Sequence, residues 1–229
     1  MSEILLIGDV HGFTKTYQKY VRRLPVPQRT IQLGDMGIGF EGVGLHAMPD
    51  RHRWFRGNHD NPAKCRKQPN YLGDYGYLAE DGIFYIAGAW SIDRAYRVEG
   101  VSWWSDEELS YEELGKAITL YEQTKPRFVI SHEAPSNAVK TLLYGLMGPY
   151  FAAKLSCSGS RTSEAMQQML DIHQPERWCF GHYHVDKEFY IPKCNTKFNC
   201  IGGMMEPGEP PHTLVLDTKE RSYESSEES

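Results

Sequence analysis

Short apolar runs and amphipathic segments alternate along this chain. Residues 4–7 are uniformly apolar, which is typical of a strand buried on both faces of a parallel sheet. Between residues 13 and 24, apolar side chains recur at helical spacing, and Pro25 and Pro27 predict the end of that helix. The start of the chain therefore indicates a strand followed by a helix.

The same alternation continues through most of the sequence. Apolar, β-branched or aromatic runs predict further strands at 30–33, 53–56, 83–90, 128–130, 178–180, 189–191, 198–201 and 213–216. Pro- and Gly-rich turns separate the last three, which we expect to be antiparallel. Helices are predicted over 106–123, behind a capping box of Ser105 and Glu108, and in a shorter amphipathic segment that ends before Pro175. Alternating strands and helices indicate the α/β class.

One segment, residues 135–161, fits neither the helical nor the strand period. Gly145, Gly148, Pro149 and Gly159 interrupt its apolar stretches. We interpret this segment as an insertion or lid over a site. The alternative is an ordinary helical connection without a functional role.

Composition indicates a soluble globular protein. The chain has 229 residues, of which 40% are hydrophobic, and its mean hydropathy is −0.54. We expect a single domain over residues 1–217 and a disordered acidic tail over 218–229, where Ser and Glu dominate without an apolar face. The sequence has neither a long apolar run nor a basic, cleavable N-terminus. We therefore expect a cytoplasmic protein that does not contact a membrane.

Charge and cysteine content exclude further classes of protein. The formal net charge is −5, which argues against a face that binds duplex nucleic acid. The five cysteines are Cys65, Cys157, Cys179, Cys194 and Cys200. They form no CxxC pair, which fits reduced thiols better than a disulfide framework or a zinc knuckle.

Five of the nine histidines lie at the ends of predicted strands, in the segments GDVHG, GNHD, SHEAP and GHYH. In an open α/β sheet, ligands bind outside the carboxyl ends of the strands, so residues that arrive there from separate strands converge in space. The convergent set contains carboxylate, amide and imidazole side chains: Asp9, His11, Asp35, Asn58, His132, His182 and His184.

This mixture of oxygen and nitrogen donors predicts a metal centre. Carboxylates, an amide oxygen and imidazoles together favour divalent Mn, Fe, Zn or Ni over calcium, and no cysteine lies at a ligand position. Seven candidates exceed the four ligands of one tetrahedral zinc ion, so the set indicates two ions that share a carboxylate. We expect two divalent cations, Mn first, with Fe, Zn or Ni as alternatives.

The order and spacing of these residues resembles the calcineurin-like metallophosphoesterase family. The family pattern is Asp-x-His, Gly-Asp, Gly-Asn-His-Asp/Glu, His and Gly-His-x-His, and the matching residues run from Asp9 to His184. The resemblance implies a four-layer α/β/β/α sandwich of two mixed β-sheets flanked by helices. It also implies a dinuclear phosphoesterase, in which a hydroxide that bridges the two ions attacks phosphorus.

Carried over residue by residue, the resemblance implies two sets of metal ligands. One set is Asp9, His11, Asp35 and His184, and the other is Asp35, Asn58, His132 and His182, with Asp35 as the bridge. His59 matches the catalytic histidine, which would stabilise phosphoryl charge or protonate the leaving oxygen. Arg56 matches an arginine that would grip two phosphate oxygens. Asp60 would either orient His59 or cap a helix at the surface.

The sequence departs from the phosphoprotein-phosphatase branch of that family. Ile38 and Gly39 stand where that branch has Asp and Arg, so a second phosphate-binding arginine and the usual carboxylate partner of the catalytic histidine are missing. We expect a small phosphorylated molecule or a nucleotide as the substrate, with phosphomonoesters and phosphodiesters both open. A catalytically silent metal-binding scaffold is the alternative to an enzyme.

Overall fold

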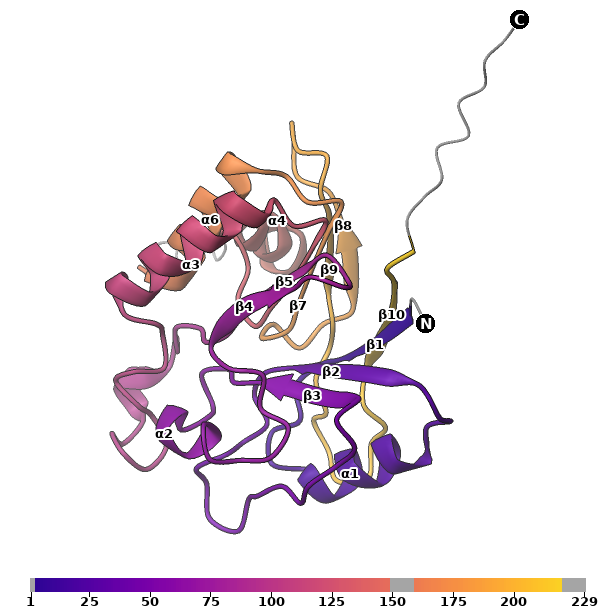
Figure 1. Ribbon diagram of the computed structural model, residues 1–229. Helices are drawn as coiled ribbons and strands as arrows, with labels where there is room; N and C mark the ends of the chain where they lie inside the picture. Colours follow the sequence, from indigo (N-terminus) through magenta and orange to yellow (C-terminus); the bar gives the residue numbers. More distant parts are fainter. Residues whose placement is uncertain (1–2, 149–158, 220–229) are drawn as a thin grey trace, which may run out of the picture.

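The computed structural model describes residues 3–148 and 159–219, and two β-sheets form its centre (Figure 1). The first sheet has four strands, in the order β10 (Thr213–Asp217), β1 (Glu3–Ile7), β2 (Arg29–Leu33) and β3 (His52–Phe55). The second has six, in the order β4 (Tyr75–Leu78), β5 (Ile83–Ile86), β6 (Phe128–Ser131), β7 (Arg177–Phe180), β9 (Lys197–Cys200) and β8 (Lys187–Phe189). Within the described residues the helices are α1 (Thr14–Arg23), α2 (Pro62–Cys65), α3 (Tyr111–Thr124), α4 (Ser136–Met147), α6 (Arg161–Ile172) and the short 3-10 helix η1 (Arg94–Tyr96).

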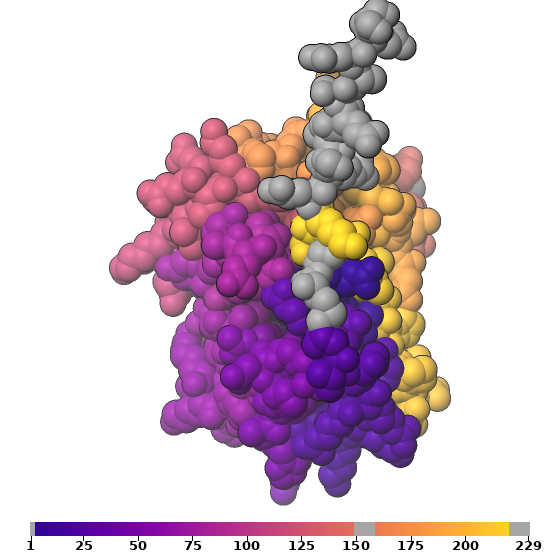
Figure 2. All heavy atoms as spheres, turned by 45° about the vertical axis from the view of Figure 1, so that its right-hand side comes forward, coloured from indigo at the N-terminus to yellow at the C-terminus, as the bar shows by residue number. Residues whose placement is uncertain are grey.

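Both sheets are mixed, with a parallel centre. Strands β1, β2 and β3 run parallel, and β10 is antiparallel to β1. Strands β5, β6, β7 and β9 run parallel, whereas β4 and β8 pair antiparallel at the two edges. Because β10 pairs with β1, the C-terminal strand lies beside the N-terminal one, and the two are adjacent on the surface as yellow and indigo (Figure 2).

Side chains of successive strand residues point to opposite faces, which separates the core into layers. Ile4 and Leu6 of β1 share one core cluster with Ile83 and Tyr85 of β5, between the two sheets. Phe84 faces the other way and packs in a cluster with residues of α3, α4 and α6. A third cluster joins the four-stranded sheet to α1 and α2 (Figure 1). The predicted four-layer α/β/β/α sandwich is therefore confirmed.

Several element boundaries differ from the sequence predictions. The capping box forms at Ser110 and Glu113, not at Ser105 and Glu108, because Glu108 is buried and accepts a hydrogen bond from the Thr162 backbone N–H at the start of α6. β5 ends at Ile86 rather than at residue 90. The β4 strand was not predicted, and the predicted antiparallel strand at 198–201 pairs parallel with β7 and antiparallel only with β8.

The segment that fitted no period contains a helix. Ser136–Met147 forms α4, whose buried residues pack against the six-stranded sheet, while 149–158, with Cys157, lie outside the described residues. Residues 220–229 of the predicted tail also lie outside the described residues.

The four cysteines other than Cys157 are unpaired. Within the described residues, no helix is long and apolar enough to cross a membrane.

Candidate metal centre and catalytic site

The candidate ligands follow the carboxyl ends of strands from both sheets. Asp9 comes two residues after β1, Asp35 two residues after β2, and His132 directly after β6. His182 and His184 follow β7. Two parallel sheet centres therefore deliver their strand ends to one place, as the sequence predicted.

Four of these ligands have left-handed backbone conformations. The φ angles are 46° at His11, 54° at Asp35, 69° at His182 and 53° at His184. For residues with a Cβ this region costs about 1–2 kcal/mol each, and such strain persists only where the surroundings fix it. The strain is concentrated in the turns that aim these side chains at the cluster.

The first group of candidate ligands contains Asp9, His11, Asp35 and His184, each with one ligand atom within 4.8 Å of the others. Asp9 Oδ2 lies 3.2 Å from His184 Nε2 and 3.7 Å from His11 Nε2. The two imidazole Nε2 atoms are 2.8 Å apart. Their nitrogen lone pairs and two carboxylates converge, which suits a divalent cation.

The second group contains Asp35, His132 and His182 within the same distance limit of 4.8 Å. His132 Nε2 lies 3.2 Å from Asp35 Oδ1 and 3.1 Å from Asn58 Oδ1. Asn58 thereby joins this group through its amide oxygen. Asp35 belongs to both groups, which is the arrangement predicted for a bridging carboxylate.

Two observations fit these residues to bound metal. Asp35 Oδ2 is buried and has no hydrogen-bond partner, which is costly for a carboxylate unless a cation neutralises it. Gly57 has no side chain where the ligands meet: a Cβ there would overlap Asp35 Oδ1 and lie 2.5 Å from His132 Nε2. The absence of a side chain at Gly57 therefore leaves room for the ligand atoms of Asp35 and His132.

The charges of the cluster favour the ionised form of Asp35 and the neutral form of His182. Burial opposes ionisation of Asp35, but the nearby His132, His59 and His11 outweigh it and hold the pKa of Asp35 well below its ordinary value. Burial, with the charge of His132, lowers the pKa of His182 to about 3. The carboxylate is therefore ionised and the His182 ring neutral near pH 7, the forms in which both bind metal.

A set of hydrogen bonds fixes the orientation of the ligands. His132 Nδ1 lies 2.8 Å from the Leu33 carbonyl oxygen, which directs Nε2 into the cluster. Asn58 Nδ2 donates to Ser91 Oγ at 2.9 Å, and Ser91 donates in turn to Glu107 at 2.5 Å, so the Asn58 oxygen faces His132. The sequence analysis did not identify the Ser91 and Glu107 roles, because only the fold brings them behind Asn58.

Glu133 is a further residue that the sequence analysis missed. Its Oε2 lies 3.8 Å from His182 Nε2, and its other oxygen accepts hydrogen bonds from the Tyr183 hydroxyl and the Ala134 N–H. The only sequence signal is its position directly after His132. Glu133 therefore supports the second group without belonging to it.

His59 borders the cluster without belonging to either ligand group. Its ring meets the ring of His11 edge to face at 5.1 Å, and its backbone N–H donates to Asp35 Oδ1 at 2.7 Å. Arg97 places a terminal nitrogen 2.7 Å from His59 Nε2, while its Nε pairs with Asp93 at 2.7 Å. The sequence analysis missed Arg97, since nothing in its local sequence links a position 38 residues away to His59.

Asp60 and Arg56, two of the predicted catalytic residues, do not line the cavity beside the candidate ligands. The Asp60 carboxylate is buried and accepts hydrogen bonds from the backbone N–H groups of Met36, Gly37, Ile38 and Gly57. It therefore holds the loop after Asp35 and neither binds the His59 ring nor caps a surface helix; Asn61 caps α2 instead. The predicted role of Asp60 as an orienting partner is not supported by these contacts.

Arg56 does not face the cavity described below, contrary to the predicted grip on phosphate. It is 1% exposed, its Nε donates to Asp74 Oδ1 at 2.7 Å, and its Nη1 donates to the Glu107 carbonyl oxygen at 2.5 Å. Because its donors are directed at protein acceptors, Arg56 anchors the end of β3 to neighbouring loops.

We expect Arg56→Met to destabilise the fold while Arg66→Met does not. Both arginines pair with Asp74, but Arg56 is buried whereas the Arg66 side chain is 47% exposed. Removing one partner of a buried pair costs about 3–5 kcal/mol, against less than about 1 kcal/mol at the surface. For a chain of this size, the Arg56 variant should melt about 6–20 °C lower. Thermal unfolding of both variants at pH 7 checks this expectation.

The pair of Arg56 and Asp74 predicts that the stability of the fold depends on pH. Burial opposes ionisation of Asp74, but Arg56 and hydrogen bonds outweigh it and lower its pKa below the ordinary value of 3.8. A lowered carboxyl pKa stabilises the fold above the ordinary value, and that stabilisation is lost as the pH falls through the folded value. The stability difference between wild type and Asp74→Asn should therefore shrink below about pH 4. A stability difference between the two proteins that stays the same below pH 4 would contradict the lowered pKa of Asp74.

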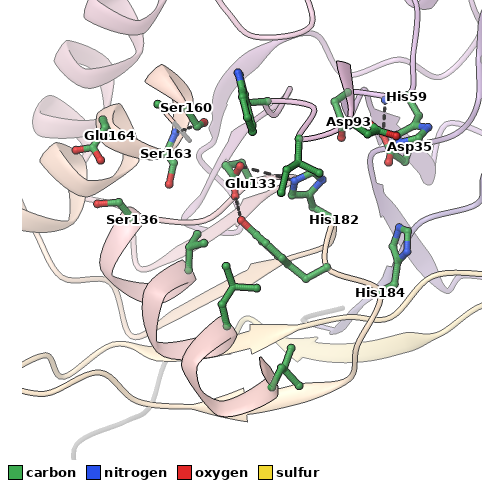
Figure 3. A pocket seen from close by; sticks show the side chains of 18 of the residues that line it. Asp35, His59, Asp93, Glu133, Ser136, Ser160, Ser163, Glu164, His182 and His184 are labelled. Atoms are coloured by element: carbon green, nitrogen blue, oxygen red, sulfur yellow. Dashed lines mark hydrogen bonds and ion pairs between the residues drawn. The ribbon is translucent and has the colours of Figure 1, made fainter. Parts of the chain in front are cut away.

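A cavity of about 480 Å³ opens beside the metal centre (Figure 3). Asp35, Asn58, His59, His182 and His184 line one end of it. Figure 3 shows Glu133 and His182 between Asp35 and His59 on one side and the serines near α6 on the other. The candidate metal centre therefore forms part of a cavity large enough for a small organic ligand.

The fold and site together define an α/β/β/α protein with a candidate metal centre at its strand ends. A family model described as calcineurin-like phosphoesterase matches residues 2–186, and the chain therefore belongs to this family of metal-dependent phosphoesterases. No curated protein matches the chain in sequence.

Among solved structures, a phosphopantetheinyl hydrolase from Mycobacterium tuberculosis has a similar fold. The match has a TM-score of 0.52 and covers 88% of this chain and 90% of that chain, at 12% sequence identity. At this identity the likeness shows the shared fold alone.

Proposed function

We propose that this protein is a dinuclear metal-dependent phosphoesterase that hydrolyses phosphomonoesters. The observation that carries the proposal is the buried Asp35 carboxylate, which belongs to both groups of candidate ligands. Two divalent cations, with Mn as the first candidate and Fe, Zn or Ni as alternatives, supply Lewis acidity and positive charge for a phosphate ester when they are bound. The Asp9 and Asp35 carboxylates and the imidazoles around them hold those cations.

His59 acts on the leaving oxygen of the ester. Its ring borders both ligand groups and lines the cavity, so it reaches a phosphate bound there without being a ligand itself. Burial and the charges of Arg97, His11 and His132 outweigh the effect of Asp35 and lower the pKa of His59. A bound phosphate adds negative charge beside the ring, which favours a proton at Nε2 and its transfer to the leaving oxygen.

Arg97 takes the role that the sequence analysis gave to Arg56. Its guanidinium lines the cavity, and Asp93 holds it through Nε at 2.7 Å and through a terminal nitrogen at 2.8 Å. In the structure a terminal nitrogen points at His59 Nε2, but a phosphate oxygen is a stronger acceptor than a neutral imidazole. Arg97 keeps its hydrogen bonds to Asp93 and to the Ser102 carbonyl oxygen and directs the remaining N–H groups of its terminal nitrogens to the phosphate, which leaves His59 free to carry the proton.

Phosphomonoesters fit this site better than phosphodiesters. A monoester leaves several charged oxygens for the cations and for Arg97, and it carries one organic group. Among the described residues, the cavity offers that group one extended wall, formed by α4 and the start of α6. A diester would need room for a second organic group beside the metal centre.

The test is hydrolysis by chelator-stripped protein, to which Mn, Fe, Zn, Ni or Mg is added back. We expect no turnover without metal, and with Mn at least about tenfold faster hydrolysis of p-nitrophenyl phosphate than of bis-p-nitrophenyl phosphate. A preference for the diester would instead support a nucleotide phosphodiesterase. Turnover of neither substrate by metal-loaded protein would support the catalytically silent scaffold.

A further inference from the structure

The cavity has two chemically different parts. Its catalytic end contains the candidate metal ligands, His59 and Arg97, whereas its other wall comes from α4 and the start of α6. In Figure 3, Asp35, His59, Asp93 and His184 lie on one side of Glu133 and His182, and the labelled residues of α6 lie on the other. The second part extends beyond the space that phosphate needs.

The α4 wall is apolar. Val139, Leu143, Leu146 and Met147 line the cavity from this helix, and Ile92 faces it from the loop after β5. Leu146 is 47%, Met147 53% and Ile92 55% exposed, so these three side chains meet water when the cavity contains no ligand. Contiguous exposed apolar residues beside a catalytic site are typical of a surface that an apolar ligand covers.

The charge of this part excludes a second phosphate group. Among the described residues that line the cavity, Arg97 is the only arginine or lysine, and it lies against His59. Around the start of α6 the polar lining consists of Ser136, Ser160, Ser163 and the carboxylate of Glu164. A nucleoside diphosphate or triphosphate would place negative charge there without a cation to neutralise it.

We propose that the alcohol part of the natural ester is apolar and uncharged, an alkyl or aryl group that lies along α4. This inference rests on the proposed phosphomonoesterase function and adds the substrate class to it. The apolar group displaces water from Leu146, Met147 and Ile92, while the phosphate occupies the metal centre. Binding energy from α4 thus positions the ester bond beside His59.

The test compares ethyl, butyl and hexyl phosphate, whose leaving groups differ in apolar length but barely in acidity. We expect kcat/KM to rise by about two- to fourfold for each added methylene group, since burying one contributes roughly that factor. Leu146→Asn should reduce this dependence on chain length. Tyr144→Asn is the matched control, because Tyr144 is 61% exposed on the same helix but does not line the cavity, and it should keep the wild-type dependence.

Other outcomes overturn the inference without touching the proposed function. If ethyl phosphate is hydrolysed but kcat/KM does not change with the length of the alkyl chain, α4 does not bind the alcohol part of the ester. If hexane-1,6-diol bisphosphate, an alkyl monoester of similar leaving-group acidity with a second phosphate, has a kcat/KM more than about twice that of hexyl phosphate, the excluded charge is in fact accommodated. Failure to hydrolyse any of these monoesters with metal present would instead contradict the phosphomonoesterase function itself.

Discussion

Asp35→Asn is expected to remove both metal ions and to abolish metal-dependent hydrolysis. Asp35 belongs to both groups of candidate ligands, so its substitution weakens two sites at once. The neutral amide has the same shape but lacks the charge that holds two cations. Metal content after gel filtration, measured by elemental analysis, should fall from two equivalents per chain to none.

This substitution is chosen because it spares the fold. Asp35 has a φ of 54°, a conformation that asparagine tolerates better than alanine does. The amide oxygen can still accept the hydrogen bond that His59 N–H donates to Asp35 Oδ1. Thermal unfolding should therefore show a folded variant, which separates loss of metal from loss of structure.

Two companion variants make the assignment specific. His11 belongs to the first group alone, so His11→Ala should lose one ion and keep the other. His46 is exposed and belongs to neither group, so His46→Ala should keep both ions and full activity. Retention of two ions by Asp35→Asn would contradict the shared carboxylate.

His59→Ala is expected to lower kcat by about 10²–10⁴-fold while both metal ions stay bound. The side chain borders the cluster but is in neither ligand group, so its loss removes a proton donor and no metal ligand. The measurement pairs steady-state kinetics with elemental analysis of the same sample.

The leaving group distinguishes proton donation from charge stabilisation. If His59 protonates the leaving oxygen, the loss should be larger for hexyl phosphate than for p-nitrophenyl phosphate, whose leaving group needs no proton near neutral pH. An equal loss on both substrates would assign His59 to phosphoryl charge instead. Full activity in His59→Ala would remove it from the mechanism.

The candidate ligands were accessible to sequence reasoning because each lies within four residues of the carboxyl end of a strand. A short apolar run followed by Gly and Asp, or by His, predicts both the strand and the side chain at its carboxyl end. Asp9, Asp35 and His132 were found in this way, and the structure brings them together. Metal ligation restricts residue type and backbone turn locally, so its signal is local too.

Arginine positions were harder to infer, since an arginine reaches far from its backbone. Arg56 stands next to Gly57 and Asn58, which suggested a phosphate contact, yet its guanidinium is buried against Asp74. Arg97 stands in a loop without a motif, yet it reaches His59. The local sequence places the Cα of an arginine, but tertiary packing decides which acceptor its guanidinium contacts.

The sequence by itself determined the α/β alternation, the strands of the core and the candidate metal ligands. Hydrophobic periodicity and the residue types that bind metal can both be recognised within a few consecutive residues. Only the tertiary structure decided which arginine faces the cavity, that Glu107 and Ser91 orient Asn58, and that α4 lines the cavity with apolar side chains. These features depend on contacts between residues far apart in the chain. No local pattern specifies such contacts, since they arise when two sheets and their helices pack into one body.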